Sequence, residues 1–272
     1  MLWSIRPDCR KEAIEVAQQI SVEGRGLHRD NLLKEYTEYF ARATSMDMLP
    51  IDMEGENVAV VSVVGPLVNM INPWTANYPL LTAAFDSLKE DDKVEAVIVR
   101  FKTPGGTVSG LLDCAKALRE LSEAKVTIAQ NDGGCYSAGY FLAVHCGEIY
   151  SGETDHIGNI GTVSSLDDFS GLYQKEGIRS VTSKTGPIKG LGIFGDPITT
   201  VQEEFLQHMV DEHFADFRRV IVENRELTDE QFAAVSDGRW WLGREAVENG
   251  IIDRLSTFSE TLEAVQNFIS ES

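Results

Sequence analysis

Three short segments of the chain carry the residue types of acyl-transfer chemistry. Ser137 lies at the start of an expected helix of small residues, within Tyr136–Phe141. The turn Thr103–Gly106, Thr-Pro-Gly-Gly, precedes this serine by one expected strand–helix unit, and Lys189 follows it later in the chain. A nucleophile, an oxyanion-binding turn and an amine base are the parts of a serine–lysine protease, so their combination predicts one.

Ser137 is the candidate nucleophile. A reactive serine is favoured at a helix start, where free N–H groups and the helix dipole stabilise developing negative charge. Its neighbours Ala138 and Gly139 are small enough for a substrate to approach the backbone closely. A serine N-cap beside small packing residues leaves the same pattern, so the residues alone keep both interpretations open.

The turn Thr103–Gly106 is the candidate oxyanion site. It directly follows an apolar strand and precedes a helix, and its paired glycines leave a backbone N–H able to point at an oxyanion. A Pro-Gly-Gly sequence is also an ordinary turn. Its position one strand–helix unit before Ser137 favours the functional interpretation.

Lys189 is the candidate base because its sequence neighbourhood is apolar. No acidic residue lies between Lys184 and Asp196, and the surrounding residues are mostly Pro, Ile, Gly, Leu and Phe. A lysine acts as a general base only when its amine is neutral, and an apolar setting favours the neutral form. A solvated loop lysine is the alternative interpretation. Lys184, closer to the end of an expected strand, is a weaker candidate base.

Composition limits the partners that the chain can have. Its 272 residues are 43% hydrophobic and 25% charged, which is ordinary for a globular protein, and the formal net charge is −19. A strongly negative chain is a poor partner for nucleic acid or an anionic membrane, because both attract basic surfaces. No apolar stretch approaches the ~18 residues of a membrane span. We therefore expect that the protein binds neither nucleic acid nor a membrane and that it is located in the cytoplasm.

The two ends of the sequence differ in their patterns. Charges near the N-terminus stand where a signal peptide has its apolar core. Residues 1–52 have helical patterns and are expected to form an N-terminal helical arm, with residues 53–272 as the catalytic domain.

The four cysteines, Cys9, Cys114, Cys135 and Cys146, lack CxxC spacing. We therefore expect reduced thiols and no zinc site at these residues.

Strand and helix patterns alternate through the larger part. Apolar runs at 58–64, 94–101 and 126–130 alternate with helical patterns, which predicts an α/β domain with largely parallel strands. Shorter strands are expected at 162–164 and 180–183. A long amphipathic helix is expected over residues 200 to 225.

Five ordered motifs between about Val58 and Leu255 resemble the S49 (signal peptide peptidase A-like) serine peptidases, which belong to the wider ClpP/crotonase fold. The fold that this implies is α/β, ClpP/crotonase-like, with repeated βα units and the N-terminal helical arm in addition. The motifs are the Pro-Gly-Gly turn, the Ser137-Ala-Gly-Tyr-Phe segment, Ile157–Val163, Lys184–Lys189 and Asp237–Ala246.

The resemblance implies a role for each matching residue. The family's nucleophile in its Ser-x-Gly-Tyr segment corresponds to Ser137, and its general base, the last lysine of the Lys184–Lys189 segment, to Lys189. The Pro-Gly-Gly turn implies that the Gly106 N–H donates to the oxyanion, with the Ala138 N–H as second donor. The resemblance implies no metal and no organic cofactor.

The sequence departs from the family pattern at three positions. Asn159 stands where the family often has a serine that orients the lysine, and its side-chain oxygen could still accept a hydrogen bond from the amine. Thr103 replaces the usual serine before Pro-Gly-Gly, and Ala138 replaces a common glycine. Asn159 is the departure that places the geometry of the base in question.

Two expected features narrow the resemblance, namely a helical N-terminal arm and a form without a membrane anchor. Together they resemble phage and prophage head-maturation proteases (minor capsid protein C-like). Those enzymes cleave scaffold and capsid proteins during procapsid assembly in the host cytoplasm. Family members form ring-like or dome-like oligomers with active sites near protomer boundaries. The resemblance thus implies protein substrates and a homo-oligomer.

Other interpretations of single motifs are weaker. His156, next to Asp155, is a rival base, with a polar loop histidine as the plain alternative. The segment Gly190–Gly195 spells GxGxxG but lacks the strand–turn–helix setting of a dinucleotide site, and Pro197 follows it. It is expected to be a loop that carries Lys189.

Two other function classes remain open from the residues. A crotonase-type acyl-CoA enzyme has a similar oxyanion turn, but it would need a basic cluster for the CoA phosphates and would leave the Lys189 segment without a role. A non-catalytic capsid or scaffold component would keep the fold and lose hydrolysis. Asn159 is the one residue that favours this last class.

Overall fold

The computed structural model describes residues 49–55, 57–71 and 75–271 of the chain. The predicted helical arm of residues 1–52 therefore lies outside the described residues except at its end. There Ile51 and Asp52 belong to β1 (Ile51–Glu54), which pairs antiparallel with β2 (Val58–Val64). These two residues are part of the sheet and not of a helix, because their backbone extends the edge beside β2.

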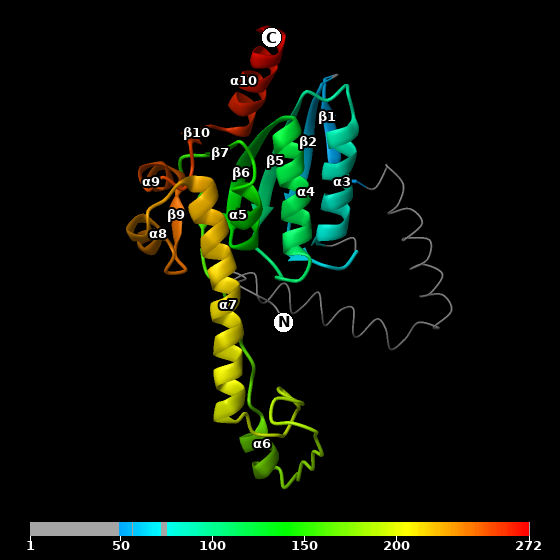
Figure 1. Ribbon diagram of the computed structural model, residues 1–272, viewed down its shortest axis with the longest axis vertical. Helices are drawn as coiled ribbons and strands as arrows, with labels where there is room; N and C mark the ends of the chain where they lie inside the picture. The colour runs from blue at the N-terminus through cyan, green and yellow to red at the C-terminus, as the bar shows by residue number, and fades with distance from the viewer. Residues whose placement is uncertain (1–48, 56, 72–74, 272) are drawn as a thin grey trace, which may run out of the picture.

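A mainly parallel sheet is the frame of the domain (Figure 1). Its main path runs β1-β2-β5-β6-β7-β10, and every neighbouring pair after β1 is parallel. The predicted α/β class with repeated βα units is confirmed. The strands after β2 are β3 (Leu67–Val68), β4 (Ala76–Asn77), β5 (Ala96–Thr103), β6 (Val126–Tyr136), β7 (Glu148–Ser151), β8 (His156–Gly158), β9 (Trp240–Leu242) and β10 (Arg254–Leu255).

Helices cover both faces of this sheet. α3 and α4 lie side by side over one face, where their apolar side chains and those of α5 form the larger core with the sheet. α10 covers part of the other face through a smaller cluster that includes Val265. The helices are α3 (Tyr78–Glu90), α4 (Leu111–Ala124), α5 (Ala138–Ala143), α6 (Ser170–Lys175), α7 (Thr200–Arg225), α8 (Asp229–Val235), α9 (Gly243–Glu248) and α10 (Phe258–Glu271).

The strands are apolar on both faces because helices cover both. β5 illustrates this, since Ala96 and Ile98 belong to the smaller cluster while Val97 and Val99 belong to the larger core. Each fully buried side chain of this size contributes about 1.5–3 kcal/mol relative to an exposed one. The carboxyl ends of β5 and β6, where the candidate turn and Ser137 lie, are therefore held by a rigid frame.

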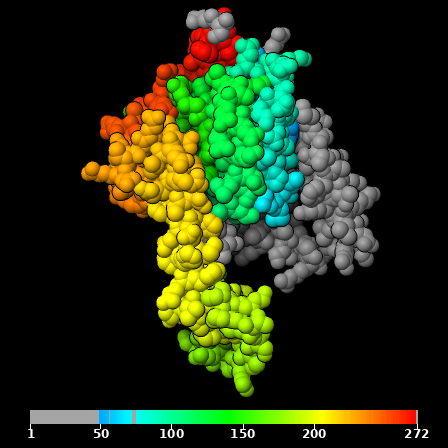
Figure 2. All heavy atoms as spheres, in the orientation of Figure 1, coloured from blue at the N-terminus to red at the C-terminus, as the bar shows by residue number. Residues whose placement is uncertain are grey.

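Residues 161–199 leave this frame and form what we call the projecting arm (Figures 1 and 2). None of its residues is buried. The strands predicted at 162–164 and 180–183 are wrong: the structure has no strand there, because an extended segment outside the domain has no sheet edge to pair with. The arm contains α6 and returns to the domain through α7.

α7 joins the projecting arm to the domain. Its C-terminal end is anchored by a bidentate ion pair between Arg225 and Asp253. The Nη1–Oδ2 distance is 2.8 Å and the Nη2–Oδ1 distance is 2.9 Å. Phe217 and Ile221 are buried against the domain, whereas at the other end of the helix only Gln202 is buried. The helix therefore extends away from its anchored end and carries the arm with it.

Candidate active site

Ser137 lies in a sharp turn between β6, which ends at Tyr136, and α5, which begins at Ala138. Its backbone has φ 50° and ψ −116°, a conformation that non-glycine residues rarely adopt and that costs about 1–3 kcal/mol. The Ser137 N–H donates to the Gly158 carbonyl at 2.8 Å. Such a strained strand-to-helix turn is the arrangement that presents a nucleophilic serine in other hydrolases.

Glycine and small residues allow this turn to form. A Cβ on Gly139 would lie 2.4 Å from Cγ2 of Thr103, so the second residue after Ser137 must be glycine for α5 to pass the end of β5. The Ser137 side chain is only 4% exposed, and its Oγ makes no hydrogen bond among the residues that the structure describes. Oγ is thus available to a substrate and a base.

The Thr103–Gly106 turn presents a backbone N–H towards the same place. The Leu67 N–H donates to the Gly105 carbonyl, and the Thr107 N–H donates to the Leu67 carbonyl, both at 2.9 Å. Because N–H directions alternate along an extended chain, the Gly106 N–H points away from Leu67, and no hydrogen bond of the described residues uses it. A Cβ on Gly106 would lie 1.9 Å from the Leu67 oxygen, so this approach requires glycine.

Thr103 supports the turn as a serine would. Its Oγ1 donates to the Gly65 carbonyl at 2.7 Å and accepts from the Gly105 N–H at 3.2 Å. Since these hydrogen bonds need only a hydroxyl, the replacement of the family's serine by threonine preserves the turn. The Thr103 methyl contacts α5 at Gly139, which joins the two halves of the site.

One cavity of about 130 Å³ brings the three predicted residues Gly106, Ser137 and Ala138 together. The Ala138 N–H is at the first turn of α5, where helix N–H groups have no partner within the helix. Most other lining residues are apolar, and α7 supplies one wall. They are Thr107, Val108, Leu111, Leu112, Phe141, Gly161, Thr162, His213, Asp216 and Phe217.

Sequence analysis missed His213 and Asp216 at this cavity. In the sequence, His213 lies within a helical pattern, and nothing there marks it as part of a site. Together with Phe217, which packs on Phe141 at 5.3 Å between ring centroids, they lie on one face of α7. Their spacing was visible in the sequence, but nothing in it indicated that this helix face meets the start of α5.

Lys189 lies elsewhere in the chain. It is an exposed residue of the projecting arm and does not line the Ser137 cavity. Its segment is attached to the far end of α7, where Gln202 Nε2 donates to the Pro187 carbonyl at 3.1 Å. Phe217, further along α7, lines the Ser137 cavity. The stretch of α-helix from Gln202 to Phe217 is roughly 22 Å long. Within one chain the structure therefore does not bring Lys189 to Ser137. Figure 1 shows the projecting arm at the end of α7 that points away from the sheet.

Asn159 lies near Ser137, and both its backbone N–H and its side-chain amide already donate hydrogen bonds. It follows Gly158, whose carbonyl accepts from the Ser137 N–H, and its own φ is 51°. Its Nδ2 donates to the Gly238 carbonyl at 2.6 Å, and its N–H donates to the Arg239 carbonyl at 2.8 Å. In this chain Asn159 holds the loop before β9 against the turn that carries Ser137.

The rival motifs do not form sites. His156 Nδ1 lies 3.1 Å from the Tyr136 hydroxyl, and the residue does not line the Ser137 cavity. The segment Gly190–Gly195 consists of turns on the projecting arm, with no strand before it and no helix directly after it. This is not the setting of a dinucleotide site.

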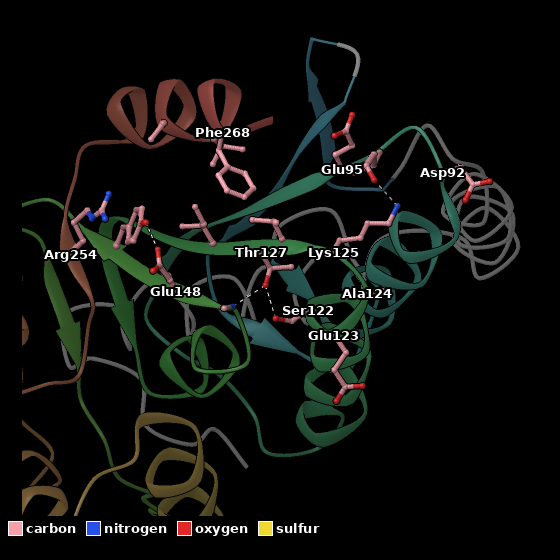
Figure 3. Close-up of a pocket in the computed structure, with 17 residues that line it drawn as sticks. Asp92, Glu95, Ser122, Glu123, Ala124, Lys125, Thr127, Glu148, Arg254 and Phe268 are labelled. Carbon is pink, nitrogen blue, oxygen red and sulfur yellow. Dashed lines mark hydrogen bonds between the residues drawn. The ribbon is translucent and has the colours of Figure 1, made fainter. Parts of the chain in front are cut away.

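A larger hollow of about 1070 Å³ lies at the opposite end of the sheet (Figure 3). It contains Ser122 and Lys125, and the Lys125 amine donates to the Asp91 and Val94 carbonyls. The Ser122 hydroxyl accepts from Thr127 Oγ1 at 2.7 Å. These residues bind the end of α4 to the sheet and form no second catalytic pair.

Burial keeps other reactive groups near the site inert. Full burial raises the pKa of the Cys135 thiol, two residues before Ser137, and burial raises the pKa of Cys146 to about 12. The Tyr140 hydroxyl donates to the Ile251 carbonyl at 2.8 Å, and burial raises its pKa as well. The predicted reduced state holds for the three described cysteines, Cys114, Cys135 and Cys146, while Cys9 lies outside the described residues.

Comparison with known proteins decides the family. Residues 119–268, more than half of the chain, match Peptidase family S49. The chain belongs to this family. The predicted resemblance is therefore confirmed, and the S49 segment includes Ser137, Asn159, Lys189 and α7. The candidate oxyanion turn with Gly106 lies before the matched segment.

The chain is similar to several curated proteins at low identity. It is 28% identical over 187 residues to "Putative protease MJ0651" of Methanocaldococcus jannaschii, covering 69% of this chain and 60% of that protein. It is 22% identical to "Protease 4" of Haemophilus influenzae, covering 91% and 40%. It is 24% identical to "Capsid assembly protease C" of Escherichia phage lambda, covering 77% and 49%.

The chain spans about 60% of the length of the first relatives that it matches. A solved structure of an enoyl-CoA hydratase/isomerase family member overlaps with a TM-score of 0.48 at 15% identity, covering 81% of this chain and 73% of that one. An overlap of this quality carries no functional weight. In the part of the chain that the structure describes, no helix could span a membrane, and no group of side chains could hold a metal ion.

Proposed function

We propose that this S49 family member is a serine endopeptidase with Ser137 as nucleophile and Lys189 as general base. The observation that carries the proposal is the cavity in which Ser137 Oγ, the Gly106 N–H and the start of α5 meet. A serine in a strained turn beside a backbone N–H that no other group uses is the geometry of acyl transfer.

The proposed reaction moves one proton in each direction through Lys189. Neutral Lys189 accepts the Ser137 hydroxyl proton while Oγ attacks the scissile carbonyl carbon, and the Gly106 and Ala138 N–H groups stabilise the oxyanion. Lys189 then donates that proton to the leaving amine as the C–N bond breaks. A water, deprotonated by Lys189, hydrolyses the acyl-enzyme, and the proton returns to Oγ. The steps require neither a metal nor an organic cofactor.

Lys189 reaches Ser137 from a second copy of the chain in this proposal. The projecting arm holds Lys189 roughly 22 Å along α7 from its own cavity. The arm also exposes large apolar side chains, among them Val181 at 74% and Phe194 at 66% exposure, which a neighbouring copy would cover. A head-to-tail contact of this kind repeats from copy to copy, and it closes into a ring when the rotation between neighbouring copies divides a full turn.

The natural substrates are proposed to be scaffold and capsid proteins of a phage procapsid, in the host cytoplasm. Two relatives support this: "Capsid assembly protease C" of phage lambda and "Head-tail preconnector protein GP5" of Enterobacteria phage P21, the latter 23% identical over 94% of this chain. The apolar cavity beside Ser137 would receive the substrate side chain next to the scissile bond.

Fluorophosphonate labelling with mass-spectrometric mapping tests the proposed pair. Wild type should be labelled at Ser137, and Lys189→Ala should lose labelling by at least about a hundredfold. Lys184→Ala is the matched control, because it removes a lysine from the same arm and should keep labelling. Absence of labelling in a folded, assembled wild type would instead favour a non-catalytic capsid or scaffold component.

A further inference from the structure

Three aromatic rings, those of Tyr136, His156 and Trp240, form a cluster beside the turn that carries Ser137. The Tyr136 and Trp240 ring centroids are 6.4 Å apart with the rings at 89°, and those of His156 and Trp240 are 6.1 Å apart. The Tyr136 and His156 centroids are 6.4 Å apart, and the Tyr136 hydroxyl lies 3.1 Å from His156 Nδ1. Each ring therefore contacts the other two.

The backbone joins this cluster to Ser137. Tyr136 is the residue immediately before Ser137 and pairs with Gly158 in the β6–β8 ladder. Gly158 pairs in turn with Trp240 on β9, and its carbonyl accepts the Ser137 N–H. The three rings thus come from the three strands that surround the strained turn.

The Tyr136 ring is tightly placed. The residue is buried, and a Cβ on Gly134 would lie 2.6 Å from Cε2 of this ring, so only glycine at 134 allows the ring its position. Fixing the ring fixes the orientation of the peptide bond that leads into Ser137. A strained backbone conformation persists only where its surroundings allow no other, and this cluster is such a surrounding.

We infer that Tyr136, His156 and Trp240 form a positioning cluster that holds Ser137 in its reactive backbone conformation. None of the three lines the Ser137 cavity, so they act through Ser137 and not on the substrate. The inference rests on the proposed function, in which Ser137 is the nucleophile. It also gives His156, which the sequence suggested as a rival base, a different role.

A plain packing role would produce a different result. Trp240 is 45% exposed, so more than half of its surface is buried and Trp240→Ala should also lower stability. Labelling is therefore measured under conditions in which the variant is shown to be folded. The same truncation removes the edge contact on Tyr136 and the contact on His156. If the cluster only fills space, the reactivity of Ser137 should not follow this change; if the cluster positions Ser137, it should.

The test is the rate at which a fluorophosphonate labels Ser137 in the assembled protein. Trp240→Ala should lower the maximal inactivation rate about tenfold and leave the half-saturating reagent concentration unchanged, because the cavity is intact. Trp240→Phe keeps a ring and should recover most of the rate. Phe268→Ala, which removes a 60% exposed ring on α10, is the matched control and should label like wild type.

Tyr136→Phe provides a second measurement that does not depend on the stability of Trp240→Ala. It keeps the ring and removes the hydroxyl that contacts His156, and it should slow labelling about threefold. Wild-type rates in both Trp240→Ala and Tyr136→Phe would overturn the positioning cluster. Absence of Ser137 labelling in wild type would overturn the proposed nucleophile itself, and the two failures are thereby distinguished.

Discussion

The turn around Ser137 and the projecting arm around Lys189 differ in how firmly their own chain holds them. Ser137 is buried, bonded through its N–H to Gly158 and surrounded by the sheet and α5. No residue of the arm at 161–199 is buried, and Lys189 itself is exposed. The chain thus holds the proposed nucleophile and oxyanion donors firmly within its own domain, and carries the proposed base on a segment that would need a partner copy to reach them.

This difference explains why the two regions impose different demands on sequence. In the turn, a Cβ on Gly106 or Gly139 would lie 1.9 Å or 2.4 Å from a neighbouring heavy atom. A single added carbon there is therefore enough to prevent the turn from taking this shape. In the arm, a Cβ on Gly171 or Gly186 would meet nothing within 4 Å, and the close contacts at Gly190 and Gly195 are with side chains of the arm itself, Ile193 and Tyr173. We therefore expect changes in the turn to alter chemistry and folding together, and changes in the arm, Lys189 apart, to act through assembly.

The largest effect is expected at Ser137. Ser137→Ala should lower peptidase activity by at least about 10³-fold, because the nucleophile is lost. Ser137→Gly should be equally inactive, yet more stable than Ser137→Ala by about 1 kcal/mol, because glycine adopts φ 50° without strain. Chemical denaturation of the two variants measures this, and equal stability would show that the turn is not strained.

Gly106→Ala should produce the next largest effect. The added Cβ would lie 1.9 Å from the Leu67 oxygen, so the turn must shift and the Gly106 N–H must move away from the oxyanion. We expect kcat to fall by about 10²–10³-fold. Gly171→Ala, where nothing lies within 4 Å, is the control. A Gly106→Ala enzyme with wild-type kcat would exclude this N–H as a donor.

Phe194→Ser tests the arm alone. Phe194 stacks on Phe169 at 5.1 Å and is 66% exposed, so its loss should weaken assembly and change the unfolding free energy of the domain by less than about 0.5 kcal/mol. Sedimentation velocity should show smaller species than for wild type, with activity reduced in parallel. Phe268→Ser changes a similarly exposed ring on α10, at 60% exposure, and should leave assembly unchanged. If it dissociates the oligomer instead, the interface lies elsewhere.

The smallest effect is expected at His145, which supports the cavity wall from behind. Its Nδ1 lies 2.8 Å from the Phe141 carbonyl, and burial lowers its pKa. The unfolded chain, with an ordinary histidine pKa of about 6.5, then binds the proton more readily, so stability present above this pH is lost as pH falls below it. His145→Gln should flatten the fall of the melting temperature between about pH 7 and pH 5. An unchanged slope would assign the acid sensitivity to other groups.

The same contrast separates what the sequence predicts from what it does not. β2 at Val58–Val64 and α7 at Thr200–Arg225 have the predicted bounds, because burial against the sheet and a helical repeat mark them locally. Ser137 and Gly106 were predicted beside each other because consecutive parallel strands end at one edge of a sheet. This much follows from patterns within single segments.

The arm could not be predicted in that way. The segment 180–183 has the composition of a strand, but a strand also needs a neighbouring edge, and the arm has left the sheet. Likewise, the wall formed by His213 and Asp216 depends on how α7 crosses α5, which is a tertiary contact that helical periodicity does not contain. The distance between Lys189 and Ser137 depends on the same crossing.

Subunit mixing tests the central claim most directly, namely that the two regions meet between copies. Ser137→Ala and Lys189→Ala, each inactive alone, are combined in equal amounts into mixed oligomers whose composition native mass spectrometry verifies. Random assembly should restore activity at about one quarter of the sites, where an intact Ser137 meets an intact Lys189 of a neighbour. Mixed oligomers without any activity would contradict the claim, because a pair within one chain is broken in every copy.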